Sequence, residues 1–293
     1  MSLMSHRGVH QTYHRENLNN STCTATRIDP PQHNFVENTL PSIDAAISYG
    51  ADMIEIDVKL TSDSEIILFH DAKLDCRSNG SGPTHKLTLA ELKALDIGYG
   101  YTADDGATFP FRGQFFGAIP TLVETLTKFP ETQFLVNLKH GKAHEGEFYA
   151  NYIKDLNSER LSFVGAASPA KSVNLVHPDM IMQTRSGAKA CLKGYLLSGW
   201  YGGMPEACHN SYVPIPANVR HLIWGWPHRF ERRLNAVGSR SMLLGPIEGQ
   251  GMTGLDDADQ LNLIPKGYKG IVFTNKIEVV GPLLKPSSYS EYQ

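Results

Sequence analysis

The chain has 293 residues, enough for one large α/β barrel or two ordinary domains. Its residues are 41% hydrophobic and 19% charged, which is typical of a globular protein. Its formal net charge of -3 excludes the basic field that nucleic-acid binding needs. No apolar run approaches the ~18 residues of a membrane span, so we expect no stable membrane insertion. We also expect no signal peptide, because His6-Arg7-Gly8 follows too closely on Met1.

The four cysteines are scattered along the chain without CxxC spacing: Cys23, Cys76, Cys191 and Cys208. This pattern predicts reduced thiols and a cytoplasmic location, because paired cysteines belong mainly to secreted proteins. No internal repeat divides the chain, and we expect a single domain over residues 1–293.

The first predicted strand ends at His6-Arg7, and a polar loop over residues 9–35 follows it. A loop of this length inside a compact domain is often a lid or a binding element. A predicted helix comes next, with Asn38 or Thr39 as its cap.

The stretch from residue 50 to 71, GADMIEIDVKLTSDSEIILFHD, carries the strongest local signal. Its segments IEIDV and EIILF read as strands, and the few residues between them allow only an antiparallel hairpin. Glu55 and Asp57 point the same way, because they are two apart on a strand. The hairpin register places His70 across from Glu55 or its neighbour, so we expect all three side chains on one face.

Two carboxylates aimed at one point repel each other unless a proton or a cation lies between them. Hard divalent cations such as Mg²⁺ and Ca²⁺ prefer such oxygen ligands, which favours a metal site at Glu55 and Asp57. The alternative is that the pair forms the solvent-facing half of an alternating strand.

The insertion over about residues 72–119 contains one short predicted helix, 89–95, and an aromatic stretch that fits either a small satellite core or a wall of the substrate pocket. Strands and helices alternate after it. The predicted strands are 133–139, 161–166, 180–184, 219–224, 240–244 and 270–275, and the predicted helices are 121–129, 145–156, 169–176, 188–197, 230–237 and 256–263.

Together with the strands at residues 6 and 54, and without the antiparallel return strand 65–70, these strands number eight. Eight alternating units predict an α/β fold of the TIM (β/α)8 barrel type, with active residues at the carboxyl ends of its strands. His6 and Arg7, Glu55 and Asp57, and Lys139 end the first three strands, so they should meet at one mouth.

The ordered set of short motifs resembles the glycerophosphodiester phosphodiesterase family. The motifs are His6-Arg7-Gly8, Glu37-Asn38-Thr39, the segment 50–57, Thr61-x-Asp63, His70-Asp71, the strand ending in Lys139 and, more loosely, residues 267–274. The resemblance implies a TIM barrel with an insertion after the His-Asp motif. It also implies metal-dependent hydrolysis of a glycerophosphodiester to glycerol phosphate and an alcohol.

By position, the resemblance implies that His6 and His70 form the acid/base pair, and that Arg7 and Lys139 hold the phosphate. It further implies that Glu55 and Asp57 bind Mg²⁺ or Ca²⁺, and that Glu37 either ligates the metal or orients Arg7. Cations offset charge on the phosphate oxygens, and in-line displacement needs a base on one side and an acid on the other. Which histidine is the acid, and whether water or a glycerol hydroxyl attacks, stay open.

Three features depart from the family pattern. Asn137 stands where the family has a glutamate metal ligand, so we expect weaker metal binding or a shifted metal preference. The loop 9–35 is longer than usual, and we expect it to cover the mouth and narrow substrate choice. Trp226, just after the predicted strand 219–224, either stacks on a substrate group such as a quaternary ammonium or packs in the core.

Two other functions compete with hydrolysis of this small-molecule substrate. One is a lyase-type phosphodiesterase of the sphingomyelinase D or phosphoinositide phospholipase type, which would release a cyclic phosphate. The other is a catalytically impaired phosphodiester-binding protein, suggested by Asn137 and opposed by the presence of His6, His70, Glu55 and Asp57.

Overall fold

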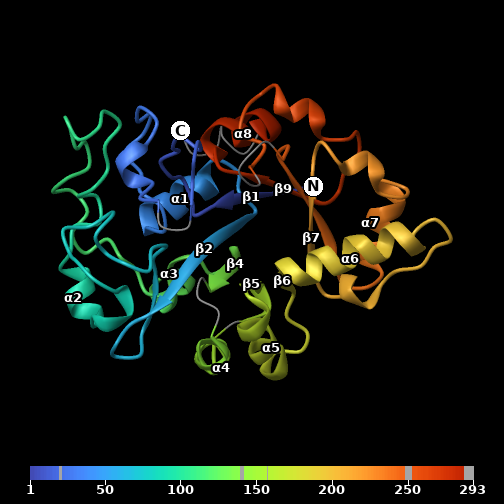
Figure 1. The fold of residues 1–293 in the computed structure, drawn as a ribbon, viewed down its shortest axis with the longest axis horizontal. Coiled ribbons are helices and arrows are strands. Elements are labelled where there is room, and N and C mark those ends of the chain that lie inside the picture. The colour runs from blue at the N-terminus through green and yellow to red at the C-terminus, as the bar shows by residue number, and fades with distance from the viewer. Residues whose placement is uncertain (20–21, 139–141, 157, 248–252, 287–293) are drawn as a thin grey trace.

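A computed structural model describes residues 1–19, 22–138, 142–156, 158–247 and 253–286. Eight parallel strands form a nearly closed barrel with helices around it (Figure 1). The strand order is β6-β5-β4-β2-β1-β9-β8-β7, and a single bridge between Met182 and Ser211 joins its two ends. The predicted TIM barrel is confirmed.

The strands are β1 (Ser2–His6), β2 (Met53–Leu60), β3 (Ile66–Leu68), β4 (Gln133–Leu138), β5 (Leu161–Gly165), β6 (Met182–Thr184), β7 (Tyr212–Pro216), β8 (Arg240–Leu244) and β9 (Ile271–Thr274). The helices are α1 (Leu40–Ser48), α2 (Leu89–Lys93), α3 (Leu122–Lys128), α4 (Ala143–Tyr152), α5 (Ala167–Val176), α6 (Arg185–Ser198), α7 (His228–Asn235) and α8 (Ile277–Leu284). The short strand β3 lies outside the barrel path and pairs antiparallel with β2, with Val58 opposite Leu68. Within the described ranges, no helix is long and apolar enough to cross a bilayer.

Threonine hydroxyls cap the first turns of four helices, α1, α2, α3 and α6. The side chain of Thr39 accepts a hydrogen bond from the backbone N–H of Ser42 at the start of α1. Thr88 and Thr121 form capping boxes with the glutamates three residues later, at the starts of α2 and α3. Each cap satisfies backbone N–H groups that the first helical turn leaves without a partner.

Two predicted elements are wrong. The predicted strand 219–224 is instead a 3₁₀ turn, η5 (Arg220–Leu222), and the barrel strand is β7. Pro214 and Pro216 make this segment unlike an ordinary strand in sequence, because proline is rare in central strands. The barrel tolerates them because β7 is fully paired on one side only. The predicted helix 256–263 is reduced to the 3₁₀ turn η6 (Gln260–Leu263), while α8 was not predicted and contains Pro282.

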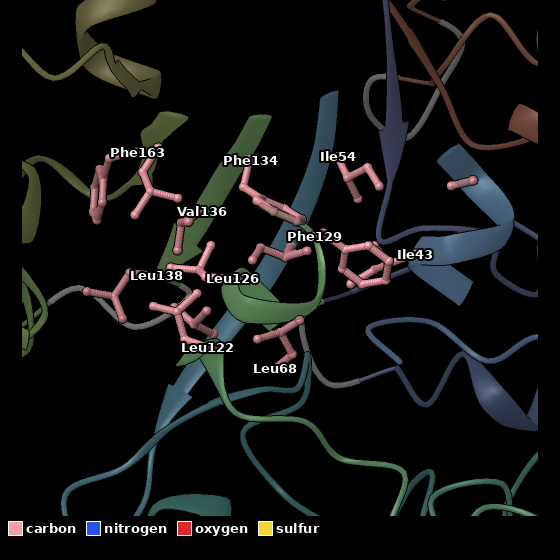
Figure 2. Packing of buried hydrophobic residues seen from close by; sticks show 14 of the residues in the cluster. Ile43, Ile54, Leu68, Leu122, Leu126, Phe129, Phe134, Val136, Leu138 and Phe163 are labelled. Atoms are coloured by element: carbon pink, nitrogen blue, oxygen red, sulfur yellow. The ribbon is translucent and has the colours of Figure 1, made fainter. Parts of the chain in front are cut away.

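The alternation of side chains along the strands divides the core into two layers. Outward-facing residues of β2 and β4, such as Ile54 and Phe134, pack against α1 and α3 (Figure 2). Inward-facing Met4, Met53 and Leu135 fill the barrel interior. Successive side chains on a strand alternate between its two faces. The polar residues that follow these inward-facing residues at every second position therefore point into the barrel at the carboxyl ends of the strands.

A further apolar core joins the loop 9–35 to the insertion 72–119. It includes Ala25 and Ile28 from the loop, and Tyr101 and Phe111 from the insertion. Tyr101 and Phe111 therefore belong to a satellite core, one of the two predicted alternatives for the aromatic stretch. Coverage of the barrel mouth by the loop stays a prediction.

The expectation of reduced thiols is wrong, because Cys23 pairs with Cys76 and Cys191 pairs with Cys208. The first disulfide links the loop 9–35 to the insertion, and the second links α6 to the turn η4 (Glu206–Cys208). The partners lie 53 and 17 residues apart, and no short spacing announces either pair. The predicted cytoplasmic location rested on free thiols and stays untested.

Candidate active site

The carboxyl ends of β1, β2 and β4 bring together four of the predicted site residues. Strand register sets His6 beside Glu55 and Asp57 beside Asn137. The Nε2 atom of His6 lies 3.7 Å from Oε2 of Glu55, and Asn137 donates through Nδ2 to Oε1 of Glu55 at 2.7 Å. The sequence prediction that these strand ends converge is therefore met for these residues.

A tight turn after β1 holds Arg7 against Asp57. Arg7 and Asn38 both take left-handed backbone conformations, with φ of 61° and 57°, and the N–H of Asn38 donates to the carbonyl of Arg7. Gly8 is required between them and α1, because a Cβ atom there would lie 2.2 Å from the hydroxyl of Ser42. Left-handed backbone conformations of residues other than glycine are uncommon and cluster at functional sites.

Asp57 is fully buried and is held on several sides. Its Oδ2 atom lies 2.9 Å from Nε of Arg7 and accepts a hydrogen bond from Nδ2 of Asn38 at 3.2 Å. Asn38 also accepts the backbone N–H of Asp57 through Oδ1 at 3.0 Å. One asparagine therefore fixes both the strand end and its carboxylate.

A chain of charged groups connects His70 to this centre. His70 Nδ1 lies 2.5 Å from Oδ1 of Asp71, and Oδ2 of Asp71 lies 2.8 Å from Nε of Arg77. Nη1 of Arg77 lies 2.7 Å from Oε1 of Glu37, which is itself 3.8 Å from Arg7. The buried hydroxyl of Tyr101 completes the cluster by donating to Glu37 at 2.7 Å.

Mutual attraction keeps the members of this buried chain ionised. Burial favours the neutral forms, but Arg77 and Arg7 outweigh it and lower the pKa of Glu37. Burial also opposes ionisation of Asp71, but Arg77 and His70 hold its pKa well below the usual range. The carboxylates of Glu37 and Asp71 in turn outweigh burial and raise the pKa of Arg77.

The structure orients both histidines through Nδ1. Asn275 donates through Nδ2 to Oδ2 of Asp256 at 2.8 Å, so its Oδ1 must be the atom 2.8 Å from Nδ1 of His6. Nδ1 of His6 therefore carries the proton and Nε2 is turned toward Glu55. His70 donates through Nδ1 to an ionised carboxylate, so the lone pair of its neutral ring is likewise on Nε2.

His10 packs beside His6, with ring centroids 5.1 Å apart. Burial, with the nearby charge of Arg7, lowers the pKa of His10 to about 4. His10 is therefore neutral at physiological pH and forms an uncharged wall next to His6.

Three predicted site residues remain: Lys139, Glu37 and Trp226. Lys139 lies outside the described residues. Glu37 takes its nearest contacts from Arg77 and Tyr101, which fits an orienting role better than metal ligation. Trp226 packs on Phe230 and Tyr268, with centroids 6.1 and 5.5 Å away, which favours core packing.

The donor set at the mouth suits a hard divalent cation. Glu55, Asp57 and Asn137 offer carboxylate and amide oxygens on adjacent strands, the ligand type that Mg²⁺ and Ca²⁺ prefer. Among the described residues, no group of three or more histidine, cysteine, aspartate or glutamate side chains is arranged to hold a metal. A third protein ligand to the metal, beside Glu55 and Asp57, would therefore have to be the amide oxygen of Asn137.

Sequence reasoning missed several residues of this site. Arg77 and Tyr101 come from the insertion, which has no regular period, and only folding brings them to Glu37. Asn275 could have been found, because it directly follows the last strand at the end where active residues gather.

A family model described as the glycerophosphoryl diester phosphodiesterase family matches residues 6–186. A curated glycerophosphodiester phosphodiesterase from Caldanaerobacter subterraneus subsp. tengcongensis is 37% identical over 107 residues, which cover 36% of this chain and 40% of the relative. The chain thus aligns with about two fifths of that relative's length.

Two solved structures share the fold. A glycerophosphodiester phosphodiesterase from Agrobacterium tumefaciens superposes with a TM-score of 0.63 at 20% identity, covering 96% of this chain and 99% of that one. An Oleispira antarctica phosphodiesterase in complex with the product sn-glycerol-3-phosphate gives 0.58 at 18% identity, with 97% of each chain covered. At these identities the likeness shows the fold alone.

Proposed function

Because the chain belongs to the glycerophosphoryl diester phosphodiesterase family, we propose that it hydrolyses a glycerophosphodiester to glycerol phosphate and an alcohol. The observation that carries the proposal is the strand register that sets His6 beside Glu55 and Asp57 beside Asn137 at one end of the barrel. The product named in the Oleispira antarctica structure has the chemistry expected for this reaction.

His6 and His70 serve as the acid/base pair in this proposal. Each ring donates through Nδ1, His6 to Asn275 and His70 to Asp71, so Nε2 is the nitrogen proposed to take or give a proton. One ring, neutral, removes the proton from the attacking water or glycerol hydroxyl as its oxygen bonds to phosphorus, and the other, as the imidazolium, protonates the alkoxide as its bond to phosphorus breaks. If the glycerol hydroxyl attacks, water then opens the cyclic phosphate to give glycerol phosphate. The orienting bonds support this reading because proton transfer requires a fixed tautomer.

Arg7 supplies positive charge at the centre, and Lys139 is proposed to add a second cation. Arg7 is itself buried and paired with Asp57, so its position is set before substrate arrives. Glu55, Asp57 and Asn137 would hold a divalent cation. When bound, that cation would act as a Lewis acid that offsets negative charge on the phosphate oxygens.

The test is a panel of glycerophosphodiesters with different alcohol groups, assayed after chelation and during readdition of Mg²⁺ or Ca²⁺. We expect turnover of at least one substrate, loss of turnover in His6→Ala and His70→Ala, and none of that loss in His209→Ala, an exposed histidine used as control. Phosphorus NMR of the products separates hydrolysis from release of a cyclic phosphate. Binding of every substrate without turnover under either metal would leave only a binding protein.

A further inference from the structure

Six large apolar side chains are exposed at the end of α6 and in the two segments beside it. They are Leu196, Leu197, Trp200, Tyr201, Leu222 and Trp224, here called the α6 patch. Leu197, Trp200 and Tyr201 are 78%, 67% and 65% exposed. Two of the three tryptophans in the chain lie in this patch. A cluster of large exposed apolar side chains is unusual on a protein surface that contacts only water, and it marks an interaction site.

Hydrogen bonds make the α6 patch one surface. The indole of Trp224 donates to the carbonyl of Leu196 at 2.9 Å, and the indole of Trp200 donates to that of Leu197 at 3.1 Å. The polar edges of both rings are therefore turned to the helix end. Trp200 and Tyr201 also contact each other, with ring centroids 5.1 Å apart.

The surface is also held rigidly. The disulfide between Cys191 and Cys208 ties α6 to the turn η4, which follows the loop that carries Trp200 and Tyr201. Arg233 of α7 donates to the carbonyl of Gly199 and to the hydroxyl of Tyr195. The aromatic side chains are therefore presented by a braced segment.

The segment that carries the α6 patch has a positive net charge, opposite in sign to that of the whole chain. Residues 185–233 contain seven lysines and arginines and two acidic residues, although the chain as a whole has a net charge of -3. Of the acidic pair, Glu231 is buried against Ser241, which leaves Glu206 as the exposed one. The exposed basic residues are Arg185, Lys189, Lys193, Arg229 and Arg232.

We propose that the α6 patch binds the surface of an anionic lipid bilayer. Tryptophan and tyrosine concentrate at the level of lipid headgroups, where an apolar ring and a polar edge are both satisfied. Leucines beside them enter the acyl boundary, and the surrounding lysines and arginines attract anionic headgroups. The proposed attachment is peripheral, because an exposed patch of this kind contacts the bilayer surface without crossing it.

The patch lies away from the insertion. Figure 1 shows α6 and α7 on one side of the barrel and α2 on the opposite side. The proposal is independent of the proposed hydrolysis, since it rests on none of the residues that are given a role in that reaction.

The test is co-sedimentation of the full chain with vesicles of phosphatidylcholine alone or of phosphatidylcholine with phosphatidylserine. We expect binding to the anionic vesicles, weaker binding to the neutral ones, and a loss of binding as salt rises. Trp200→Ser with Trp224→Ser, and separately Lys189→Glu with Lys193→Glu, should each weaken binding on the order of tenfold or more.

Leu175→Ser is the matched control, because Leu175 is also 78% exposed but lies on α5. It should leave vesicle binding unchanged. Absence of binding to anionic vesicles, or equal binding to both vesicle types, would overturn the proposal. Self-association abolished by Trp200→Ser, without vesicle binding, would assign the patch to a second copy of the chain instead.

Discussion

Asn275 accepts a hydrogen bond through Oδ1 from Nδ1 of His6 at 2.8 Å. Asp256 determines this polarity, because it accepts from both the side-chain and the backbone N–H of Asn275. The last strand of the barrel thus fixes the tautomer of a histidine on the first strand. A carboxylate in the loop before β9 therefore orients, through Asn275, one histidine of the proposed acid/base pair.

Asn275→Leu removes the acceptor while keeping a similar side-chain volume. We expect kcat to fall roughly 10- to 100-fold with little change in KM, because His6 loses its fixed tautomer and orientation. Asp256→Asn should lower kcat less, since Asn275 can then adopt either amide orientation. Asn262→Ala, an exposed asparagine in η6, is the control and should leave kcat unchanged.

Asn137→Glu restores a charged side chain next to Glu55 and Asp57. We expect Mg²⁺ or Ca²⁺ to bind roughly tenfold more tightly, because affinity at such sites rises with ligand charge. Titration calorimetry on the purified protein measures this directly and does not depend on turnover. If both metal affinity and turnover stay unchanged in Asn137→Glu, Asn137 is not a ligand.

Arg77→Met tests the buried charge chain. The substitution leaves Glu37 and Asp71 without their closest cation, and breaking such a pair typically lowers the free energy of unfolding by about 3–5 kcal/mol. Tyr101→Phe removes the hydrogen bond that the hydroxyl donates to Glu37 and the one that it accepts from Arg77. Because it leaves Glu37 and Arg77 paired with each other, it should lower the free energy of unfolding by less, about 1–3 kcal/mol. Equal losses in the two variants, measured by urea unfolding, would contradict this ranking.

The sequence predicted the parts of this protein that local patterns encode. The β2–β3 hairpin follows from two Ile/Val-rich segments and a short link, and β8 was predicted with its observed limits, 240–244. β7 was missed because its two prolines contradict an ordinary strand signal, and this position in the barrel overrides that signal.

Some residues of the candidate site could likewise be predicted from local sequence patterns, and others could not. His6, Glu55, Asp57 and Asn137 could be placed together because each follows its strand to the same end of the barrel. The contacts of Arg77 and Tyr101 with Glu37 depend on how the insertion packs on the loop 9–35. Neither that packing nor the disulfide Cys23–Cys76 that joins the two segments has a local signature.

Reduction of the disulfides should destabilise the protein. Removing a native disulfide typically lowers the free energy of unfolding by about 2–5 kcal/mol. We expect Cys23→Ser with Cys76→Ser to lower the melting temperature, and intact protein purified without reductant to show no free thiol by mass spectrometry. Four alkylated cysteines in the native protein would contradict both pairings and would restore the expectation of a reducing compartment.

Glu278 on α8 should make stability fall with rising pH. Burial, with some repulsion from Asp256, raises the pKa of Glu278 in the folded state to about 7, from an ordinary value of 4.5. Below pH 4.5 the carboxyl group is protonated in both states and has no effect. Between 4.5 and 7 only the unfolded chain ionises, so folding stability is lost across this window and stays reduced above it.

Glu278→Gln removes this penalty while keeping the shape of the side chain. We expect the variant to match the original chain near pH 4 and to exceed its free energy of unfolding by roughly 2 kcal/mol near pH 8, after a discount for partial exposure. Urea unfolding at a series of pH values measures the difference. A variant that is equally stable or less stable than the original chain near pH 8 would show that the carboxylate of Glu278 is solvated or paired in the folded protein.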